Sequence, residues 1–239
     1  MNLNNLRGLH FKLFLVMFFL FSTNITKAQT ITPPAPLLKQ IALTFDDGPY
    51  GAPTTEVLDI LKKENIHATF FVIGKNVEKY PEIVKAIVLG GNVIANHTYD
   101  HPKNLTTVPL KEFDSELSKT EEAIFSLTNL RPDLFRAPYG KTSPEMLKEL
   151  EKDNYTLVSW SVDPADWNYP KSTPELIEKI VLKEAKPDAI ILFHDGRDTH
   201  IDYPRDNLIK ALPETIEALR KEGYTFVTID KILGKNAYK

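Results

Sequence analysis

The sequence predicts an α/β fold, with parallel strands surrounded by outer helices in a single domain. Short apolar segments alternate with amphipathic segments throughout residues 39–239, and this alternation is typical of a parallel sheet with helices outside it. The apolar segments contain few polar residues, which indicates strands buried on both faces. An open doubly wound sheet and a closed barrel of seven or eight β/α units both fit. We favour the barrel because of where the polar motifs described below fall.

The predicted strands are short and apolar, and most of them end at a glycine or a polar motif. The first contains the apolar run Ile41-Ala42-Leu43, and Gly74 closes the second. The predicted strands are 40–45, 68–73, 93–96, 134–136, 156–161, 189–193 and 224–228.

The predicted helices alternate with these strands and carry start and stop signals. Thr54 and Ser143 are candidate N-caps, since a hydroxyl oxygen there can accept a hydrogen bond from the first turn. Pro174 suits a first turn, Gly90-Gly91 suits a C-terminal stop, and Pro213 predicts a bend. The predicted helices are 54–64, 81–89, 110–127, 144–152, 173–183 and 207–222, with a final turn at 231–233.

Residues 1–28 have the layout of a secretory signal peptide. They carry basic residues but no acid, and residues 13–21 form an unbroken apolar run followed by small and polar residues. This run is too short to span a bilayer, which takes about 20 residues. We therefore expect cleavage after Ala28 and no stable membrane anchor afterwards. Residues 29–38 are proline-rich and predict an extended tether to the domain at 39–239.

Charge and cysteine content narrow the classes of function. The formal net charge of −3 becomes more negative once the basic signal peptide is removed, and no basic patch or long charge run is visible. Nucleic acid is therefore a poor partner, and a neutral or cationic substrate fits better. The chain has no cysteine, which excludes disulfides and cysteine nucleophiles. We expect a periplasmic or secreted protein, whose oligomeric state the sequence does not indicate.

Two adjacent carboxylates, Asp46 and Asp47, lie at the exit of the first predicted strand. Adjacent side chains in a strand point to opposite faces, but a turn directly afterwards can rotate both toward one cavity. Two unpaired carboxylates side by side repel each other, so the pair needs a metal ion, an arginine or a lysine nearby. The alternative is an ordinary solvated Asp-Asp-Gly turn.

Two histidines, His97 and His101, follow the third predicted strand at a spacing common among metal ligands. In a helical turn, residues i and i+4 share one face, and Pro102 should end that turn at His101. The alternative is two unrelated loop histidines. His67 precedes a strand and is expected to be structural, and His200 is left unassigned.

Three further polar motifs follow later predicted strands. Residues 136–139 (RAPY) follow the fourth, 163–167 (DPADW) the fifth and 192–194 (LFH) the sixth. Trp167 lies in a polar loop rather than an apolar stripe, which favours contact with a sugar over core packing. The carboxyl ends of parallel strands form the rim on which α/β active sites are built. Five motifs at that rim therefore predict one common site.

The five motifs, in this order, resemble those of the polysaccharide deacetylase family, the NodB-homology domain of carbohydrate esterase family 4. The resemblance covers roughly residues 39–229. The matching patterns are TFDDGP at 44–49, H-[ST]-x-x-H at 97–101, R-x-P-Y at 136–139, D-x-x-D-W at 163–167 and L-x-H at 192–194. The resemblance implies a distorted βα barrel and hydrolysis of the acetamide of N-acetylglucosamine residues in peptidoglycan, a chitin-type glycan or a surface glycan.

The resemblance further implies a divalent metal held by Asp47, His97 and His101. One carboxylate and two imidazoles with an open position suit a catalytic zinc site, and cobalt, nickel or manganese are possible instead. Asp46 resembles the family's general base, with Arg136 neutralising and orienting it. The same ligand set suits non-haem iron oxygenases, but an oxygenase needs neither an adjacent carboxylate base nor a separate histidine acid.

The remaining motif residues are implied to serve the leaving group and the acetyl pocket. His194 is the expected general acid, and Asp166 is expected to keep it charged and oriented. The backbone N–H of Tyr139 resembles the family's oxyanion donor. Trp167 and Leu192 are expected to wall the acetyl pocket.

Two alternative functions stay open. An acetylxylan O-deacetylase would use the same chemistry on an ester. A non-catalytic carbohydrate-binding relative is disfavoured, because a complete set of ligands, base and acid has little structural use.

Overall fold

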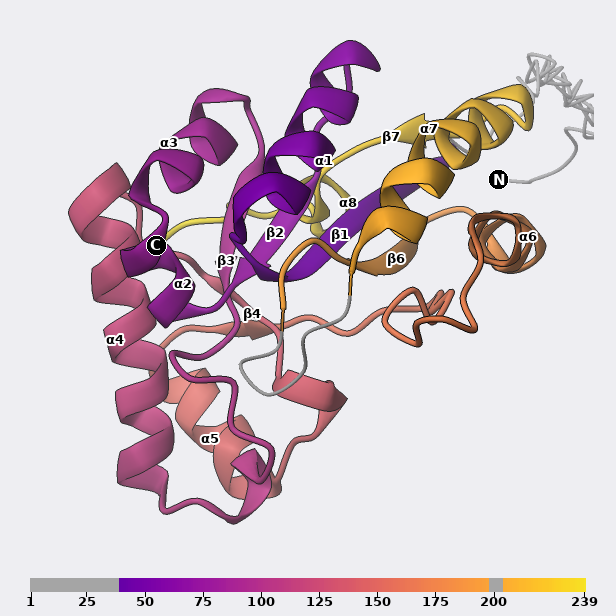
Figure 1. The fold of residues 1–239 in the computed structure, drawn as a ribbon. Helices are drawn as coiled ribbons and strands as arrows, with labels where there is room; N and C mark the ends of the chain where they lie inside the picture. Colours follow the sequence, from indigo (N-terminus) through magenta and orange to yellow (C-terminus); the bar gives the residue numbers. More distant parts are fainter. Residues whose placement is uncertain (1–38, 198–203) are drawn as a thin grey trace, which may run out of the picture. The chain divides into compact units, whose positions relative to one another are not determined.

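Seven parallel strands form one sheet in the order β5-β4-β3-β2-β1-β6, with β7 pairing the start of β1 (Figure 1). The computed structural model describes residues 39–197 and 204–239, so the predicted signal peptide, the tether and His200 lie outside the described residues. The strands are β1 Gln40–Gly48, β2 Thr69–Val72, β3 Val93–Asn96, β4 Leu134–Phe135, β5 Thr156–Leu157, β6 Ala189–His194 and β7 Thr225–Phe226.

The sheet is curled into an incomplete barrel, and a single bridge joins its two sides. Val162, which follows β5, forms an isolated parallel bridge with Ile191 of β6. The N–H of Val162 donates to the carbonyl of Ile190 (3.2 Å), and its own carbonyl accepts from the N–H of Leu192 (2.9 Å). The predicted distorted barrel is therefore confirmed, and a bridge rather than a full strand pair completes it at this point.

Helices surround the sheet (Figure 1), and several begin where the sequence predicts. Ser143 caps α5 by accepting from the N–H of Met146 (3.3 Å), and Thr173 caps α6 by accepting from the N–H of Leu176 (3.3 Å). The helices are α1 Gly51–Lys63, α2 Gly74–Lys79, α3 Pro81–Leu89, α4 Leu110–Thr128, α5 Pro144–Lys152, α6 Pro174–Glu184, α7 Asp206–Lys221 and α8 Ile229–Leu233, with 3-10 turns at Leu105–Thr107 and Pro138–Gly140.

Two predictions of local structure are wrong, and one helix is not predicted. Thr54 is not the N-cap of the first helix, which begins at Gly51 with Tyr50 in the cap position; the Thr54 hydroxyl instead donates to Asp195. Gly74 follows the second strand as predicted, but it also begins α2, the helix that the sequence does not predict. The fifth strand, predicted over 156–161, ends at Leu157.

Alternate residues of β1 face two different environments. Ile41, Leu43 and Phe45 belong to the apolar cluster shared with the surrounding helices. The Phe45 ring stacks between those of Phe70 (centroids 5.1 Å apart) and Phe193 (5.7 Å), and fully burying each such ring stabilises the fold by roughly 1.5–3 kcal/mol.

The opposite face of β1 points into the barrel, which is apolar at one end and polar at the other. Ala42 packs with Phe71 and Ile229 in a second buried cluster. Thr44 and Asp46 follow on the same face and bind the buried side chain of Arg136. The polar end lies at the carboxyl ends of the strands, where the candidate site is built.

Candidate active site

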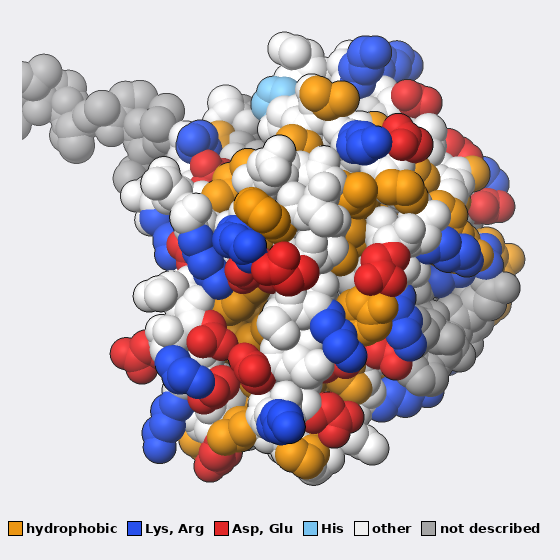
Figure 2. Space-filling model, turned by 90° about the vertical axis from the view of Figure 1, so that its left-hand side faces the viewer, with side chains coloured by type: hydrophobic (Ala, Val, Ile, Leu, Met, Phe, Trp, Pro, Cys, Tyr) orange, Lys and Arg blue, Asp and Glu red, His pale blue; other side chains and the backbone are white. Residues whose placement is uncertain are grey.

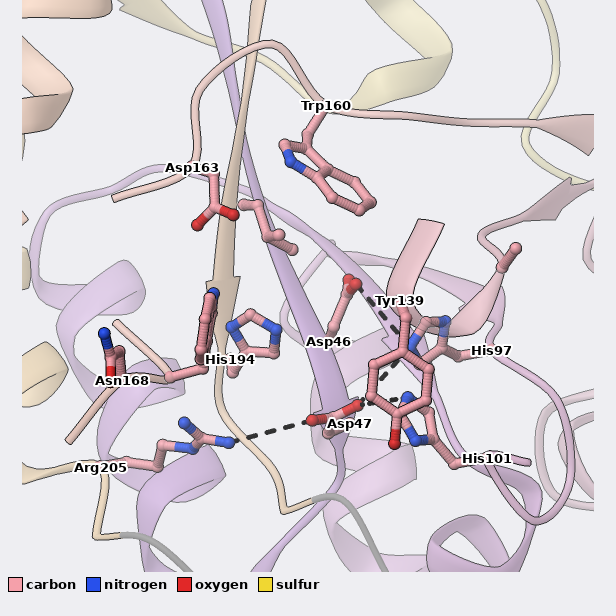
Figure 3. A pocket seen from close by; sticks show the side chains of 13 residues that line it. Asp46, Asp47, His97, His101, Tyr139, Trp160, Asp163, Asn168, His194 and Arg205 are labelled. Atoms are coloured by element: carbon pink, nitrogen blue, oxygen red, sulfur yellow. Dashed lines mark ion pairs between the residues drawn. The ribbon is translucent and has the colours of Figure 1, made fainter. Parts of the chain in front are cut away.

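A bulge at the end of β1 brings Asp46 and Asp47 to the same cavity (Figure 3). Asp46 pairs in register with Phe71 and Gly48 with Val72, so Asp47 is the extra residue, and its φ is 71°. A bulge re-aims side chains that regular pleating would send to opposite faces. Both carboxylates are buried, at 3% and 4% exposure. The sequence predicts a turn here, whereas the structure has an irregular strand end.

Two glycines allow the ends of β1 and β6 to pack without side chains between them. A Cβ on Gly196 would lie 1.9 Å from the carbonyl oxygen of Asp47, and one on Gly48 would lie 2.3 Å from Asp195 Oδ2. Asp195 is fully buried, and Thr54 Oγ1 donates to its Oδ2 (2.6 Å). Burial raises the pKa of Asp195 to about 7. This close packing sets the spacing between the two strand ends.

Arg136 crosses the barrel interior to reach Asp46. Its Nη1 donates to Asp46 Oδ1 (2.7 Å) and to Thr44 Oγ1 (2.8 Å). Its guanidinium lies 4.0 Å from the ring centroid of Phe71, and its side chain has no exposure to solvent. Removing one partner of such a buried pair would leave an uncompensated charge, which costs about 3–5 kcal/mol.

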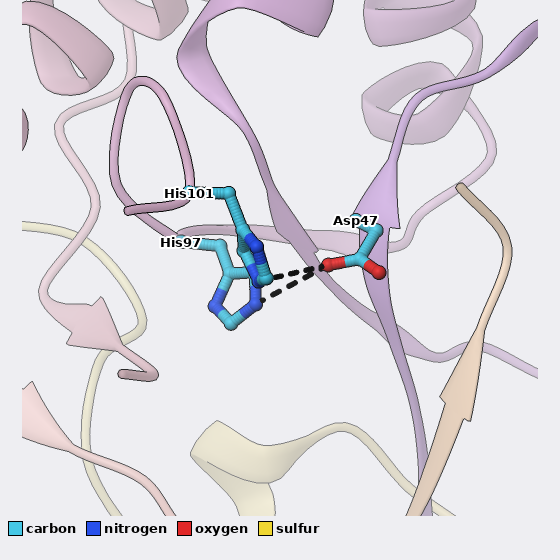
Figure 4. Close-up of side chains that lie close together, drawn as sticks. All are labelled: Asp47, His97 and His101. Atoms are coloured by element: carbon cyan, nitrogen blue, oxygen red, sulfur yellow. Dashed lines mark ion pairs between the residues drawn. The ribbon is translucent and has the colours of Figure 1, made fainter. Parts of the chain in front are cut away.

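Asp47, His97 and His101 form the one group among the described residues that could hold a metal ion through at least three ligands (Figure 4). Asp47 Oδ1 lies 3.5 Å from His97 Nε2 and 3.3 Å from His101 Nε2. This oxygen is buried and accepts no hydrogen bond from the described residues. Burial alone would raise the pKa of Asp47, but its contact with His97 and the nearby histidine charges hold the pKa well below its usual range.

The tautomer of His97 suits a metal ligand. Its Nδ1 lies 2.8 Å from the carbonyl oxygen of Arg136. A carbonyl can only accept, so Nδ1 carries the proton and Nε2 keeps its lone pair toward Asp47. The donor set, the orphaned oxygen and this tautomer all fit a divalent cation.

The segment from His97 to His101 is a loop and not the helical turn that the sequence predicts. Thr98 and His101 have left-handed φ values of 67° and 53°. Glu116 of α4 holds the loop, because its Oε2 accepts from the backbone N–H groups of Tyr99 (2.9 Å) and Asp100 (2.8 Å). The two imidazoles are thus brought together by a loop bound to α4.

His194 ends β6 opposite Asp46, with which it is paired in register. Its Nδ1 lies 2.8 Å from Asp166 Oδ1, and its backbone N–H donates to Asp166 Oδ2 (2.8 Å). Burial alone would lower the pKa of His194, but the charge and hydrogen bond of Asp166 outweigh it and raise the pKa to about 9. The imidazole is therefore cationic at neutral pH, with Nε2 as its remaining polar atom.

A cavity of about 460 Å³ is lined by three further predicted residues together with Asp46, Asp47, His97, His101 and His194. Leu192 lines it and is buried, whereas Tyr139 and Trp167 are 44% and 46% exposed at its mouth. Tyr139 has a left-handed φ of 57°, and its ring centroid lies 4.8 Å from that of His101. All ten residues that the sequence singles out thus lie at or next to this cavity.

Three cavity-lining residues are missed by the sequence reasoning. Trp160 and Asn168 line the cavity, as does Arg205. Trp160 falls inside a predicted strand, and Arg205 falls in a charged segment without a motif, so neither carries a signal of its own. Asn168 directly follows Trp167, and this adjacency is the only sequence signal that places Asn168 at the cavity.

The fold and the site define the class of protein. It is a parallel α/β barrel with a candidate metal centre, a buried Asp–Arg pair and a buried His–Asp pair at the carboxyl ends of its strands. A model of the polysaccharide deacetylase family matches residues 35–158. The chain belongs to this family, as the resemblance of its motifs predicts.

Similar proteins support this membership. The chain is 40% identical over 190 residues to the peptidoglycan-N-acetylglucosamine deacetylase of Bacillus cereus, covering 80% of this chain and 66% of that protein. It is 35% identical over 209 residues to the peptidoglycan-N-acetylmuramic acid deacetylase PdaC of Bacillus subtilis, covering 87% of this chain but only 41% of that protein. The chain thus spans less than two thirds of the length of either relative.

A solved structure shows the same architecture. The Bc1960 peptidoglycan N-acetylglucosamine deacetylase, in complex with 4-naphthalen-1-yl-N-oxidanyl-benzamide, superposes with a TM-score of 0.78 at 37% identity. The match covers 84% of this chain and 91% of that one.

Proposed function

We propose that this protein is a metal-dependent deacetylase that hydrolyses the acetamide of N-acetylated sugar residues in a glycan. The observation that carries the proposal is the joint presence, around one cavity, of the Asp47, His97 and His101 donors, the Asp46–Arg136 pair and the His194–Asp166 pair. Similarity to peptidoglycan deacetylases supports peptidoglycan as the first substrate to test.

The metal is held in this proposal by Asp47, His97 and His101, and zinc is the expected ion. When bound, a divalent cation supplies a Lewis acid that polarises the acetamide carbonyl and makes water nucleophilic near neutral pH. The ligand set leaves at least one coordination position open, as a catalytic zinc site requires. Cobalt, nickel and manganese are the other ions to test.

Asp46 serves as the general base. Its Oδ1 is occupied by Arg136, while its Oδ2 lies 3.8 Å from His97 Nε2, on the side of the metal ligands. One oxygen therefore remains to take a proton from the attacking water. The guanidinium fixes the orientation of the carboxylate through the bond to Oδ1.

His194 serves as the general acid. Asp166 occupies Nδ1, so the proton of Nε2 is the one available for the leaving amine. An amine leaves as a neutral molecule only if it is protonated, because its anion is a very poor leaving group.

The acetyl group sits against Leu192 and Trp167, and the backbone N–H of Tyr139 faces the developing oxyanion.

An extracytoplasmic location accompanies this function. Residues 1–28 are proposed to be cleaved as a signal peptide, and the deacetylase domain then occupies 39–239. Among the described residues, no helix has the length and apolarity needed to cross a membrane. On the face that Figure 2 shows, acidic and basic side chains are interspersed without a large patch of one sign, which agrees with a glycan rather than nucleic acid as partner.

Acetate release tests the class, the metal and the substrate together. The protein is stripped of metal, restored with zinc, and assayed in parallel on peptidoglycan, chitin oligomers and acetylated xylan. We expect zinc-dependent acetate release from the N-acetylated glycans. Release from acetylated xylan alone would favour the O-deacetylase, and binding without release would favour a non-catalytic relative. Oxygen consumption with Fe(II) would favour an oxygenase.

A further inference from the structure

Arg205 is a second buried guanidinium at the site, and no motif assigns it a role. It lies directly before α7, is 5% exposed, and lines the cavity (Figure 3). Its Nη2 lies 3.9 Å from Asp47 Oδ2, and this is its only ion pair among the described residues. Its Nη1 is buried without a hydrogen-bond partner there. A buried cation is costly unless a carboxylate compensates it, and among the described residues Asp47 is the carboxylate with which Arg205 forms an ion pair.

The guanidinium is fixed in place by the strand end that packs on Asp47. Arg205 Nε donates to the carbonyl of Gly196 (2.7 Å), and Gly196 lies so close to the Asp47 peptide that a Cβ there would overlap it. The Asp47 carbonyl also accepts from Asn76 Nδ2 (2.9 Å). Because the guanidinium is planar, fixing Nε also fixes the position of Nη2 relative to the Asp47 carboxylate.

The two oxygens of Asp47 therefore have different surroundings. Oδ1 faces His97 and His101 at 3.5 and 3.3 Å, and Oδ2 faces Arg205. We propose that Arg205 is a positioning residue that holds Oδ2 away from the metal, so that Asp47 binds through Oδ1 alone. This inference rests on the proposed metal site.

Binding through one oxygen keeps a coordination position open for water and substrate. If Oδ2 turned toward the metal, the carboxylate would occupy two positions, and the open position that a catalytic site needs would be lost. Arg136 and Arg205 thus act on neighbouring carboxylates in different ways. Arg136 binds Asp46 directly, whereas Arg205 restrains Oδ2 of Asp47, the oxygen that does not face the histidines.

Cobalt substitution tests this role. Co(II) is loaded into wild-type protein, Arg205→Gln, Arg205→Lys and the control Arg220→Gln, whose arginine lies in the last turn of α7 and pairs with Glu64 at the surface. We expect Arg205→Gln to bind one cobalt but to absorb more weakly in the visible range, because a higher coordination number weakens these bands, and to lose turnover by about 10- to 100-fold. Arg205→Lys, which keeps the charge, and Arg220→Gln should retain the wild-type spectrum.

Three outcomes overturn the inference. An unchanged cobalt spectrum in Arg205→Gln removes the positioning role. Equal loss of absorption in Arg205→Lys and Arg205→Gln would show that the positive charge facing Oδ2 does not restrain the carboxylate. Wild-type protein that takes up no cobalt overturns the proposed metal site and this inference with it.

A crystal structure of the zinc-loaded wild-type protein gives a test that does not depend on any variant folding. Asp47 should contact zinc through Oδ1 only, with Oδ2 within hydrogen-bonding distance of Arg205. Both oxygens on the metal would overturn the inference while leaving the metal site intact.

Discussion

The two sides of the cavity hold their charges in different ways. On one side, Asp46 and Arg136 are 2.7 Å apart inside the barrel, with side chains 4% and 0% exposed. On the other side, His194 and Asp166 are 2.8 Å apart, and 14% of the His194 side chain is exposed. A guanidinium keeps its charge at any physiological pH, whereas an imidazole can lose it. The cation beside the expected base therefore keeps its charge, whereas the imidazole that is the expected acid has a charge that depends on pH.

The largest effect is expected from a substitution that removes the proposed metal ion. His97→Ala should lose the metal and with it nearly all turnover, because two ligands hold a divalent cation poorly. Metal content by mass spectrometry and acetate release measure this. His67→Ala is the control, since His67 is exposed and contacts the carbonyl of Gly90. Full metal occupancy in His97→Ala would remove His97 from the ligand set.

Asp46→Asn should remove the expected general base and leave the metal ligands and the expected acid in place. An amide cannot take a proton from water, so turnover should fall by about 10²- to 10⁴-fold, while metal content stays at the wild-type level. The matched control is Asp59→Asn on the exposed face of α1. Near-normal acetate release from Asp46→Asn would show that another group is the base.

His194→Ala should remove the expected general acid. The size of the effect should depend on the substrate. Turnover of the acetamide should fall by about 10²-fold or more, because its amine must be protonated to leave. Hydrolysis of an activated acetate ester should fall much less, since its leaving group needs little protonation. Equal losses on both substrates would argue against the acid role.

Asp166→Asn should have the smallest effect at neutral pH, and its main effect should be on the pH dependence of turnover. The pKa of His194 is raised to about 9, chiefly because Asp166 outweighs the effect of burial. The protonated acid should therefore persist in the wild-type protein until the pH passes about 9. Without the Asp166 charge, burial lowers the pKa, so the alkaline limb of the kcat profile should move to lower pH. An unmoved limb would show that it belongs to another group.

The sequence predicts the order of strands and helices well because local signals agree with the tertiary structure. The bounds of α5 follow from Ser143 and Pro144, and those of α3 from Pro81 and Gly90. The predicted start of α1 at Thr54 is wrong because the Thr54 hydroxyl bonds to Asp195, a residue 141 positions away. No local pattern reports such a partner.

The site shows the same division between local motifs and distant contacts. The ten predicted residues belong to motifs at strand ends, and the rule that such ends share a rim is sufficient to place them together. The bulge at Asp47, the loop from His97 to His101 and the place of Arg205 depend on contacts with distant residues, including Gly196 and Glu116. These features become visible only once the strands are paired.

The pairing of β1 with β6 also governs when the site forms during folding. Thr44 donates to the carbonyl of Ile191 across 147 residues of chain, and contacts of such high sequence separation favour slow folding. The three metal ligands occur by residue 101, long before the acid on β6 is synthesised. A chain shortened before β6 would retain every ligand but leave one edge of β1 largely unpaired, and an unpaired apolar edge invites aggregation.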